Sequence, residues 1–158
     1  MNRDVCSTEY DFVKEARNQL FTYCSTIQPA DFIKEVAPFG RGGSMRNLLV
    51  HIANVYEHWI GNIALKQPVP YSGYDQFYHI EQVVSLYTTI DELMTCFLQE
   101  SEDLEAVIPF ELNGVKSKAT LLKIFTHTIT HEFHHKGQIH SISRSLGYTP
   151  VDTDIIHF

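Results

Sequence analysis

Five of the nine histidines lie in one short stretch of the chain, residues 127–140, which reads His-Thr-Ile-Thr-His-Glu-Phe-His-His-Lys-Gly-Gln-Ile-His. Within it, His131 and His135 are spaced i, i+4. On a helix this spacing puts both rings on one side, about 6 Å apart along the axis. Two imidazoles so placed commonly bind one divalent metal ion. The stretch therefore predicts metal chemistry.

The helix that would carry these histidines is predicted from about Thr120 to Leu146. Steps of ~100° per residue place an apolar stripe along it, made of Leu121, Ile124, Phe125, Ile139, Ile142 and Leu146. His131, Glu132 and His135 interrupt this stripe together with Thr128. Buried ionisable groups without partners cost several kcal/mol, so hydrogen bonds or a metal must compensate them. For the pair of histidines we favour the metal over two hydrogen-bonded core histidines.

The remaining histidines are weaker candidates. His127 and His134 lie at the shoulder of the same face, and we interpret them as surface groups or neighbours of the site. His140 points away from it, which favours a solvated role. On a second predicted helix, His51 and His58 lie seven residues apart along one edge of the apolar face, and periodicity alone does not decide which of them faces the site.

Length and composition restrict the class of protein. The 158 residues, 44% of them hydrophobic, predict one globular domain over residues 1–158. No run approaches the roughly 18 apolar residues of a membrane span, and the first residues lack the apolar core of a signal peptide, so we expect a cytoplasmic protein. The net charge of −7, without a cluster of Lys and Arg, disfavours nucleic-acid binding. Three scattered cysteines indicate neither disulfides nor a CxxC zinc site.

The apolar periodicity predicts an all-α protein, a four-helix bundle with a small hairpin or turn before the last helix. The four main helices are predicted over about residues 8–27, 44–65, 89–108 and 120–146, with a further short helix over 80–87. Expected boundary residues are Ser44 as an N-cap, Thr89 in a capping box, and Gly147 after the last helix. The hairpin or turn is predicted at Asn113-Gly114.

Two connections complete the chain. The segment 28–43 contains Gly40-Arg41-Gly42-Gly43, which lacks the residue order of a phosphate-binding loop and is interpreted as a linker. The segment 66–79 is rich in proline and aromatic residues, and is predicted to cover one end of the bundle, either sealing the core or forming a pocket wall.

Two motifs resemble the DinB/YfiT-like family of four-helix metal-binding proteins. The first is Ser44-Met45-Arg46-Asn47-Leu48-Leu49-Val50-His51-Ile52-Ala53 with Trp59, and the second is His127-x3-His131-x3-His135-Lys136-Gly137-Gln138-Ile139 with Leu146-Gly147. Length and helix order agree over nearly the whole chain. The resemblance implies that His51, rather than His58, joins His131 and His135 as a metal ligand. Lys136 stands where family members commonly have arginine.

Three neutral imidazoles would leave open positions on a bound ion, as in catalytic metal sites. Related bundles are similar to thiol-dependent transferases and isomerases, which use a low-molecular-weight thiol such as bacillithiol, mycothiol or glutathione. The resemblance therefore implies a zinc- or nickel-dependent enzyme acting on a small-molecule substrate, with Glu132 as the candidate general base.

Two alternatives remain open at this stage. The run His131-Glu132-Phe133-His134-His135 also matches the HExxH pattern of zinc peptidases, in which the glutamate is the base. However, no strand for a substrate cleft is evident, and only the acids of the tail lie downstream. The second alternative is a non-enzymatic metal-binding homodimer, because Leu122, Ile129 and Phe133 form another apolar strip on the last helix, which either a second subunit or the tail could cover.

Overall fold

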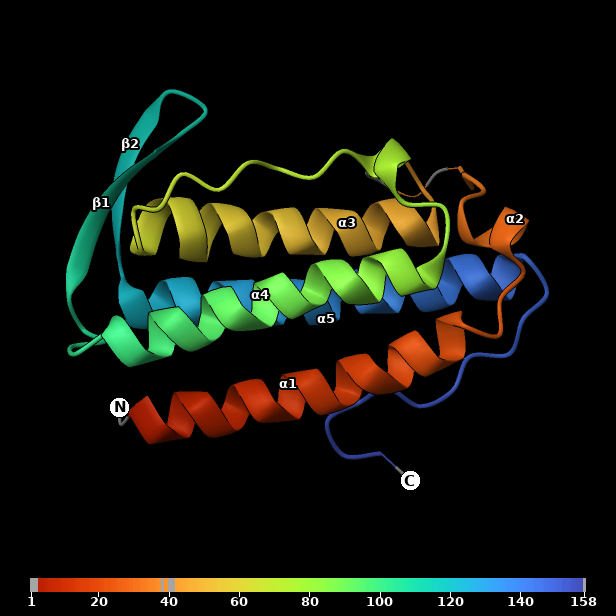
Figure 1. The fold of residues 1–158 in the computed structure, drawn as a ribbon, viewed down its shortest axis with the longest axis horizontal. Coiled ribbons are helices and arrows are strands. Elements are labelled where there is room, and N and C mark those ends of the chain that lie inside the picture. Colours follow the sequence, from red (N-terminus) through yellow and green to blue (C-terminus); the bar gives the residue numbers. More distant parts are fainter. Residues whose placement is uncertain (1–2, 38, 40–41, 158) are drawn as a thin grey trace.

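A computed structural model describes residues 3–37, 39 and 42–157. Its long helical segments lie alongside one another and enclose a hydrophobic core (Figure 1). They are α1 (Arg3–Cys24), α3 (Met45–Tyr56) with its π-helical continuation η1 (Glu57–Ala64), α4 (Ile80–Glu100) and α5 (Leu121–Ser145). Two short helices, α2 (Pro29–Phe32) and the 3-10 helix η2 (Tyr74–Gln76), lie in the connections. All four long segments contribute fully buried side chains, among them Leu20, Leu48, Met94 and Phe125.

A two-stranded antiparallel sheet precedes α5. It consists of β1 (Val107–Leu112) and β2 (Val115–Thr120), paired from Val107–Thr120 to Leu112–Val115. Asn113 and Gly114 join the strands with φ angles of 52° and 77°, as a tight hairpin turn requires. The predicted hairpin is therefore confirmed, but the label all-α is too narrow: the protein is mostly helical with a small sheet.

Several predicted helix boundaries are confirmed. The Ser44 side chain accepts a hydrogen bond from the backbone of Asn47, and Thr120 does the same for Lys123, so both are N-caps. Gly147, with a φ of +93°, follows the end of α5. These ends could be found from sequence because each depends on residues at most three positions away.

The prediction of two separate helices over 80–87 and from Thr89 is wrong, since α4 is continuous. The Thr89 hydroxyl donates to the carbonyl of Leu86 instead of capping a new helix. At the observed start of the helix, the side chain of Gln82 accepts a hydrogen bond from the backbone N–H of His79. The helix also ends at Glu100, before Pro109, which lies in β1. At the other end of the chain, α1 begins at Arg3 rather than near residue 8.

The segment 66–73 forms a strap that runs lengthwise over α3 and η1 (Figure 1). Two asparagines clamp it, each through both amide atoms. Asn54 bonds the backbone N–H and carbonyl of Ser72 at 2.8 and 3.0 Å. Asn62 bonds the same two groups of Val69 at 2.7 and 3.2 Å. The strap therefore follows the helix rather than covering one end of the bundle as predicted.

The glycine-rich connection leads into α3. Gly40 and Arg41 of the predicted linker lie outside the described residues, whereas Gly42 and Gly43 have φ angles of 82° and 64°. A Cβ on Gly43 would lie 2.6 Å from the carbonyl oxygen of Val36, so this turn requires glycine.

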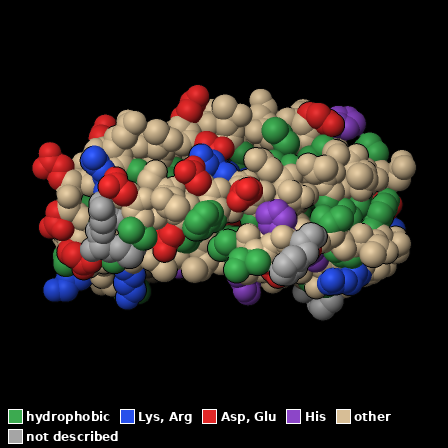
Figure 2. Space-filling view, turned by 90° about the horizontal axis from the view of Figure 1, so that it is seen from below, with side chains coloured by type: hydrophobic (Ala, Val, Ile, Leu, Met, Phe, Trp, Pro, Cys, Tyr) green, Lys and Arg blue, Asp and Glu red, His purple; other side chains and the backbone are tan. Residues whose placement is uncertain are grey.

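The surface agrees with the acidic composition. On the face seen from the side of α1, acidic and hydrophobic side chains are interspersed (Figure 2). None of the described helices combines the length and hydrophobicity needed to cross a membrane.

Candidate metal centre

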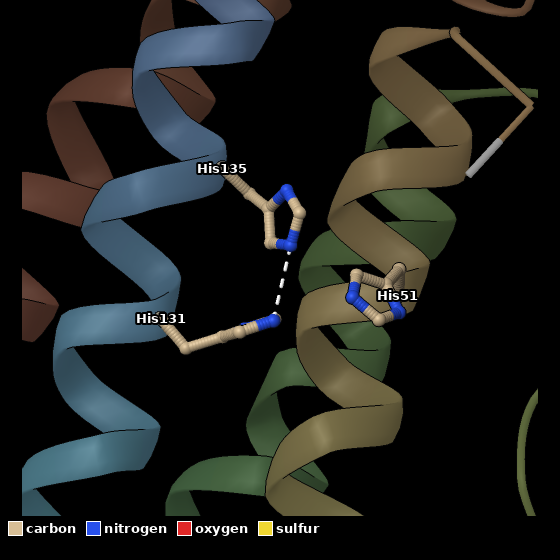
Figure 3. A group of neighbouring side chains, drawn as sticks. All are labelled: His51, His131 and His135. Carbon is tan, nitrogen blue, oxygen red and sulfur yellow. Dashed lines mark hydrogen bonds between the residues drawn. The ribbon is translucent and has the colours of Figure 1, made fainter. Parts of the chain in front are cut away.

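Three histidines from two neighbouring helices converge in the interior. His51 comes from α3, and His131 and His135 come from successive turns of α5 (Figure 3). One ring nitrogen of each lies within 4.8 Å of the other two. The ring centroids are 4.4 to 5.0 Å apart. The structure thus brings together all three residues of the predicted ligand set.

The rings of His131 and His135 are placed to share an ion. Their Nε2 atoms lie 3.0 Å apart, close to the separation of about 3.0–3.4 Å between neighbouring nitrogens on one metal ion with bonds of about 2.1 Å. On its other side, Nδ1 of His135 lies 2.6 Å from Oε1 of Gln138. Because an amide oxygen only accepts, Nδ1 carries the proton and Nε2 keeps its lone pair for a metal.

Burial keeps His131 in the form that binds metal. His51 and His135 are 9% and 7% exposed, and His131 is half-buried. Burial, followed by the neighbouring His135 and His51, lowers the pKa of His131 to about 3. Its imidazole is therefore neutral at physiological pH, which is the form required of a metal ligand.

The histidine cluster borders a pocket of about 630 Å³, which we call the histidine pocket. It is lined by His51, Asn54, Val55, His58, Trp59, Tyr71, Leu112, Asn113, His127 and His131. These residues come from α3, η1, the strap, the hairpin tip and α5. Tyr71 makes the strap a pocket wall, one of the two roles predicted for the 66–79 connection. A small molecule in this pocket would lie beside two of the three candidate ligands.

Two further histidines line the pocket outside the cluster. His58, one turn beyond Asn54, places Nδ1 2.7 Å from the Tyr71 hydroxyl, and burial lowers the pKa of its imidazole. His127 stacks edge-on against Trp59 at 5.3 Å, and burial likewise lowers its pKa. Both are placed to contact a ligand in the pocket rather than to complete the triad.

The last two histidines of the rich stretch lie elsewhere. His134 is exposed, with its ring 4.9 Å from that of His135. His140 is half-buried, stacks on Tyr23 at 6.0 Å, and places Nε2 3.3 Å from the hydroxyl of Thr153. Its predicted solvated role is wrong, because the C-terminal tail packs over it.

Glu132 is engaged in a different set of contacts. It is 1% exposed, and both of its oxygens accept hydrogen bonds from Arg17 at 2.9 Å. The Tyr56 hydroxyl also donates to it at 2.6 Å. The role of general base stays a prediction, and this pairing argues against it, because both carboxylate oxygens are hydrogen-bonded to Arg17 or Tyr56 and Glu132 does not line the histidine pocket.

The ion pair belongs to a network that joins the four long helices, and sequence reasoning missed it. Arg17 also donates to Asp91 at 2.6 Å, and the Tyr10 hydroxyl bonds the same oxygen at 2.6 Å. One signal was available: Arg17 falls on the apolar stripe of α1 formed by Val13 and Leu20. A cation at a core position requires a buried anion, although the sequence does not say which one.

Lys136 anchors the tail. It is 3% exposed, its Nζ donates to the carbonyl of Thr153 at 3.1 Å, and it lies 3.7 Å from the ring centre of Phe133. Burial lowers its pKa to about 8. This residue therefore contacts the tail, and it does not line the histidine pocket.

Comparisons with known proteins agree with the two motifs. The sequence model described as the DinB family matches residues 1–158. The chain is also 28% identical to the uncharacterized protein YizA of Bacillus subtilis (strain 168), over 93% of this chain and 91% of YizA.

Proposed function

The chain belongs to the DinB family, and from this premise we propose that it binds one divalent metal ion through His51, His131 and His135. The observation that carries the proposal is the convergence of three ring nitrogens from two helices within 4.8 Å. The donor set is made of imidazoles alone, which suit zinc and nickel better than the oxygen-preferring magnesium or calcium. Gln138 would hold His135 in the required tautomer.

We further propose that the protein is a metal-dependent enzyme acting on a small molecule, with a low-molecular-weight thiol as co-substrate. A bound metal with open positions would lower the pKa of a thiol or water beside it. The histidine pocket is of the size that small-molecule sites have. Its lining is neutral and partly aromatic, so Trp59 and His127 would pack against the substrate while His58 and Tyr71 hydrogen-bond it.

Elemental analysis of protein purified without affinity histidines tests the metal site. The wild type and the variants His51→Ala, His131→Ala and His134→Ala are each loaded with zinc, nickel or manganese and then desalted. We expect about one ion per chain in the wild type and in the His134 control, and below about a tenth in the two ligand variants. Less than about a tenth in the wild type would remove the proposal. A thiol-transfer assay with several thiols follows for the loaded protein.

The HExxH metallohydrolase is the less favoured enzyme, because the Glu132 carboxylate already accepts hydrogen bonds from Arg17 and Tyr56. It makes a distinct prediction. Cleavage of a peptide library that Glu132→Gln abolishes, and that His51→Ala leaves intact, would replace the thiol-dependent reaction with this one.

A non-enzymatic homodimer is favoured by one observation. Ile129 and Phe133 border an apolar groove on the α1–α5 face, where Phe12 is 43% exposed. Ile155 of the tail lies in the same groove, so the tail covers part of it. Light scattering after gel filtration decides whether a second copy of the chain or the tail alone covers this groove. A monomer at micromolar concentration excludes a stable dimer.

A further inference from the structure

A second pocket, of about 310 Å³, lies between η1, the strap and α4, and we call it the Glu57 pocket. It is lined by Glu57, Gln67, Val69, Thr89, Ile90, Glu92, Leu93 and Cys96. No residue of this lining belongs to the histidine pocket. The strap separates the two, with Val69 on this side and Tyr71 on the other.

The wall of the Glu57 pocket depends on a close approach of strap and helix. A Cβ on Gly61 would lie 2.8 Å from the Val69 side chain and 3.4 Å from that of Leu93, so a larger residue here would force Val69 to shift. The backbone of Gln67 donates to the carbonyl of Gly61 at 2.9 Å, and Asn62 clamps Val69. Gly61 lies in a π-helix, a form of backbone that is rare and often occurs at functional sites.

The Glu57 carboxyl has one buried oxygen that the described residues leave unsatisfied. Its side chain is 5% exposed, and Oε2 has no hydrogen-bond donor within the described part of the chain. Burial raises the pKa of this carboxyl to about 7, and the opposing influence of the Ser72 backbone is smaller. Leaving a buried carboxylate oxygen unbonded is costly. A donor supplied from the pocket would remove that cost.

The other lining groups indicate the charge of this donor. Glu92 is exposed at the rim, and none of the described residues that line the pocket is basic. Val69, Ile90 and Leu93 supply an apolar wall. Metal ligation is not indicated, because the group of potential ligands close enough to share an ion, in the described residues, is the histidine triad. A positive head with a short apolar body matches this lining.

We propose that the Glu57 pocket binds a small primary alkylammonium ion, with its nitrogen at the Glu57 carboxylate and its alkyl chain against Val69 and Leu93. Charge-assisted hydrogen bonds from an ammonium group to a buried carboxylate are stronger than those between neutral groups. Glu92 would add attraction at the rim. Because the two pockets share no lining residue, this site is independent of the metal site.

Titration of the ¹⁵N-labelled full chain with n-butylammonium tests the proposal, with n-butanol and n-butyrate as ligands of similar size. We expect saturable shifts of the amides of Val69, Leu93 and Cys96, binding of butanol weaker by about tenfold or more, and none of butyrate. Equal binding of butanol would reveal an apolar cleft only, and absence of saturable shifts at these amides would equally overturn the proposal.

Two variants assign the effect to Glu57. Glu57→Gln keeps the shape and removes the charge, and we expect it to weaken butylammonium binding about tenfold or more. Glu105→Gln makes the same change of net charge at an exposed residue outside the pocket, and should bind as the wild type does. Unchanged binding by Glu57→Gln would contradict the proposal. If that variant does not fold, the three-ligand comparison on the wild type decides, and zinc-loaded protein should give the same result.

Discussion

Arg17 on α1 donates to both carboxylate oxygens of Glu132 on α5, each at 2.9 Å, with both side chains 2% exposed. The pair joins the first and last long helices of the chain. The hydroxyl of Tyr56 adds a third bond to the carboxylate. Because neither charge reaches water, each group depends on the other to offset the cost of its burial.

Replacing Arg17 by Met should therefore lower the free energy of unfolding by about 3–5 kcal/mol, because it leaves Glu132 buried without its cation. Urea denaturation followed by circular dichroism measures this. The double variant with Glu132→Leu should regain much of the loss. Lys14→Met is the control, since its ion pair with Asp11 is exposed and should contribute less than about 1 kcal/mol. Equal losses for Arg17→Met and Lys14→Met would show that the buried pair does not stabilise the fold.

The part of the candidate site that lies within a single helix was predictable from sequence. The i, i+4 spacing of His131 and His135 fixes their relation within α5, and the structure keeps it. The choice between His51 and His58 depends on how α3 packs against α5, which periodicity does not contain. The family motif supplied that choice. Arg17 shows the same limit, because its partner Glu132 lies 115 positions away.

The fold, too, has features that local sequence determines and features that depend on tertiary contacts. The cap at Ser44, the start of the last helix near Thr120 and the Asn113-Gly114 turn are local, and they were predicted. The break expected at Thr89 was a local signal that failed, because packing of both halves of α4 on one core favours a continuous helix. The π-helical turns of η1 also had no local signal, and in the structure they lie where Gly61 closely approaches Val69 of the strap.

Gln138→Ala should weaken metal binding without removing a ligand. Its side-chain oxygen fixes Nδ1 of His135 as the protonated nitrogen, and loss of such a contact typically lowers metal affinity about 10–100-fold. Competition with a chromophoric chelator measures the affinity for zinc. Gln99→Ala, at an exposed position on α4, should match the wild type. An unchanged affinity in Gln138→Ala would mean that His135 is oriented by other contacts.

Lys136→Met should loosen the tail and change the alkaline stability. The folded-state pKa is lowered to about 8 from an ordinary 10.5, so between these values the unfolded chain binds more protons and stability rises with pH. We expect this rise, on the order of 2 kcal/mol, to be absent from the variant. Amide exchange near Thr153 should also accelerate, because its carbonyl loses the Lys136 donor. Parallel stability curves of both proteins above pH 8 would contradict the predicted effect on alkaline stability.

The contribution of Glu57 to stability should depend on pH in the opposite direction from that of Lys136, and Glu57→Gln should remove it. Burial raises the folded-state pKa of Glu57 to about 7 from 4.5, so between these values the folded protein binds more protons than the unfolded chain. Wild-type stability therefore falls as pH rises through this window and stays lower above it. The full shift corresponds to about 3 kcal/mol, and solvent screening reduces this to about 1–2 kcal/mol.

The advantage of Glu57→Gln over the wild type should accordingly be larger at pH 8 than at pH 4.5 by about 1–2 kcal/mol, measured by urea denaturation without added amine. Glu105→Gln should show no such difference, because its side chain faces water. Adding butylammonium at pH 8 should stabilise the wild type and leave Glu57→Gln unchanged, since the cation binds the ionised carboxylate of the folded state. Curves for Glu57→Gln that run parallel to the wild type from pH 4.5 to 8 would mean that the buried carboxyl already has a partner, and that its pocket needs none.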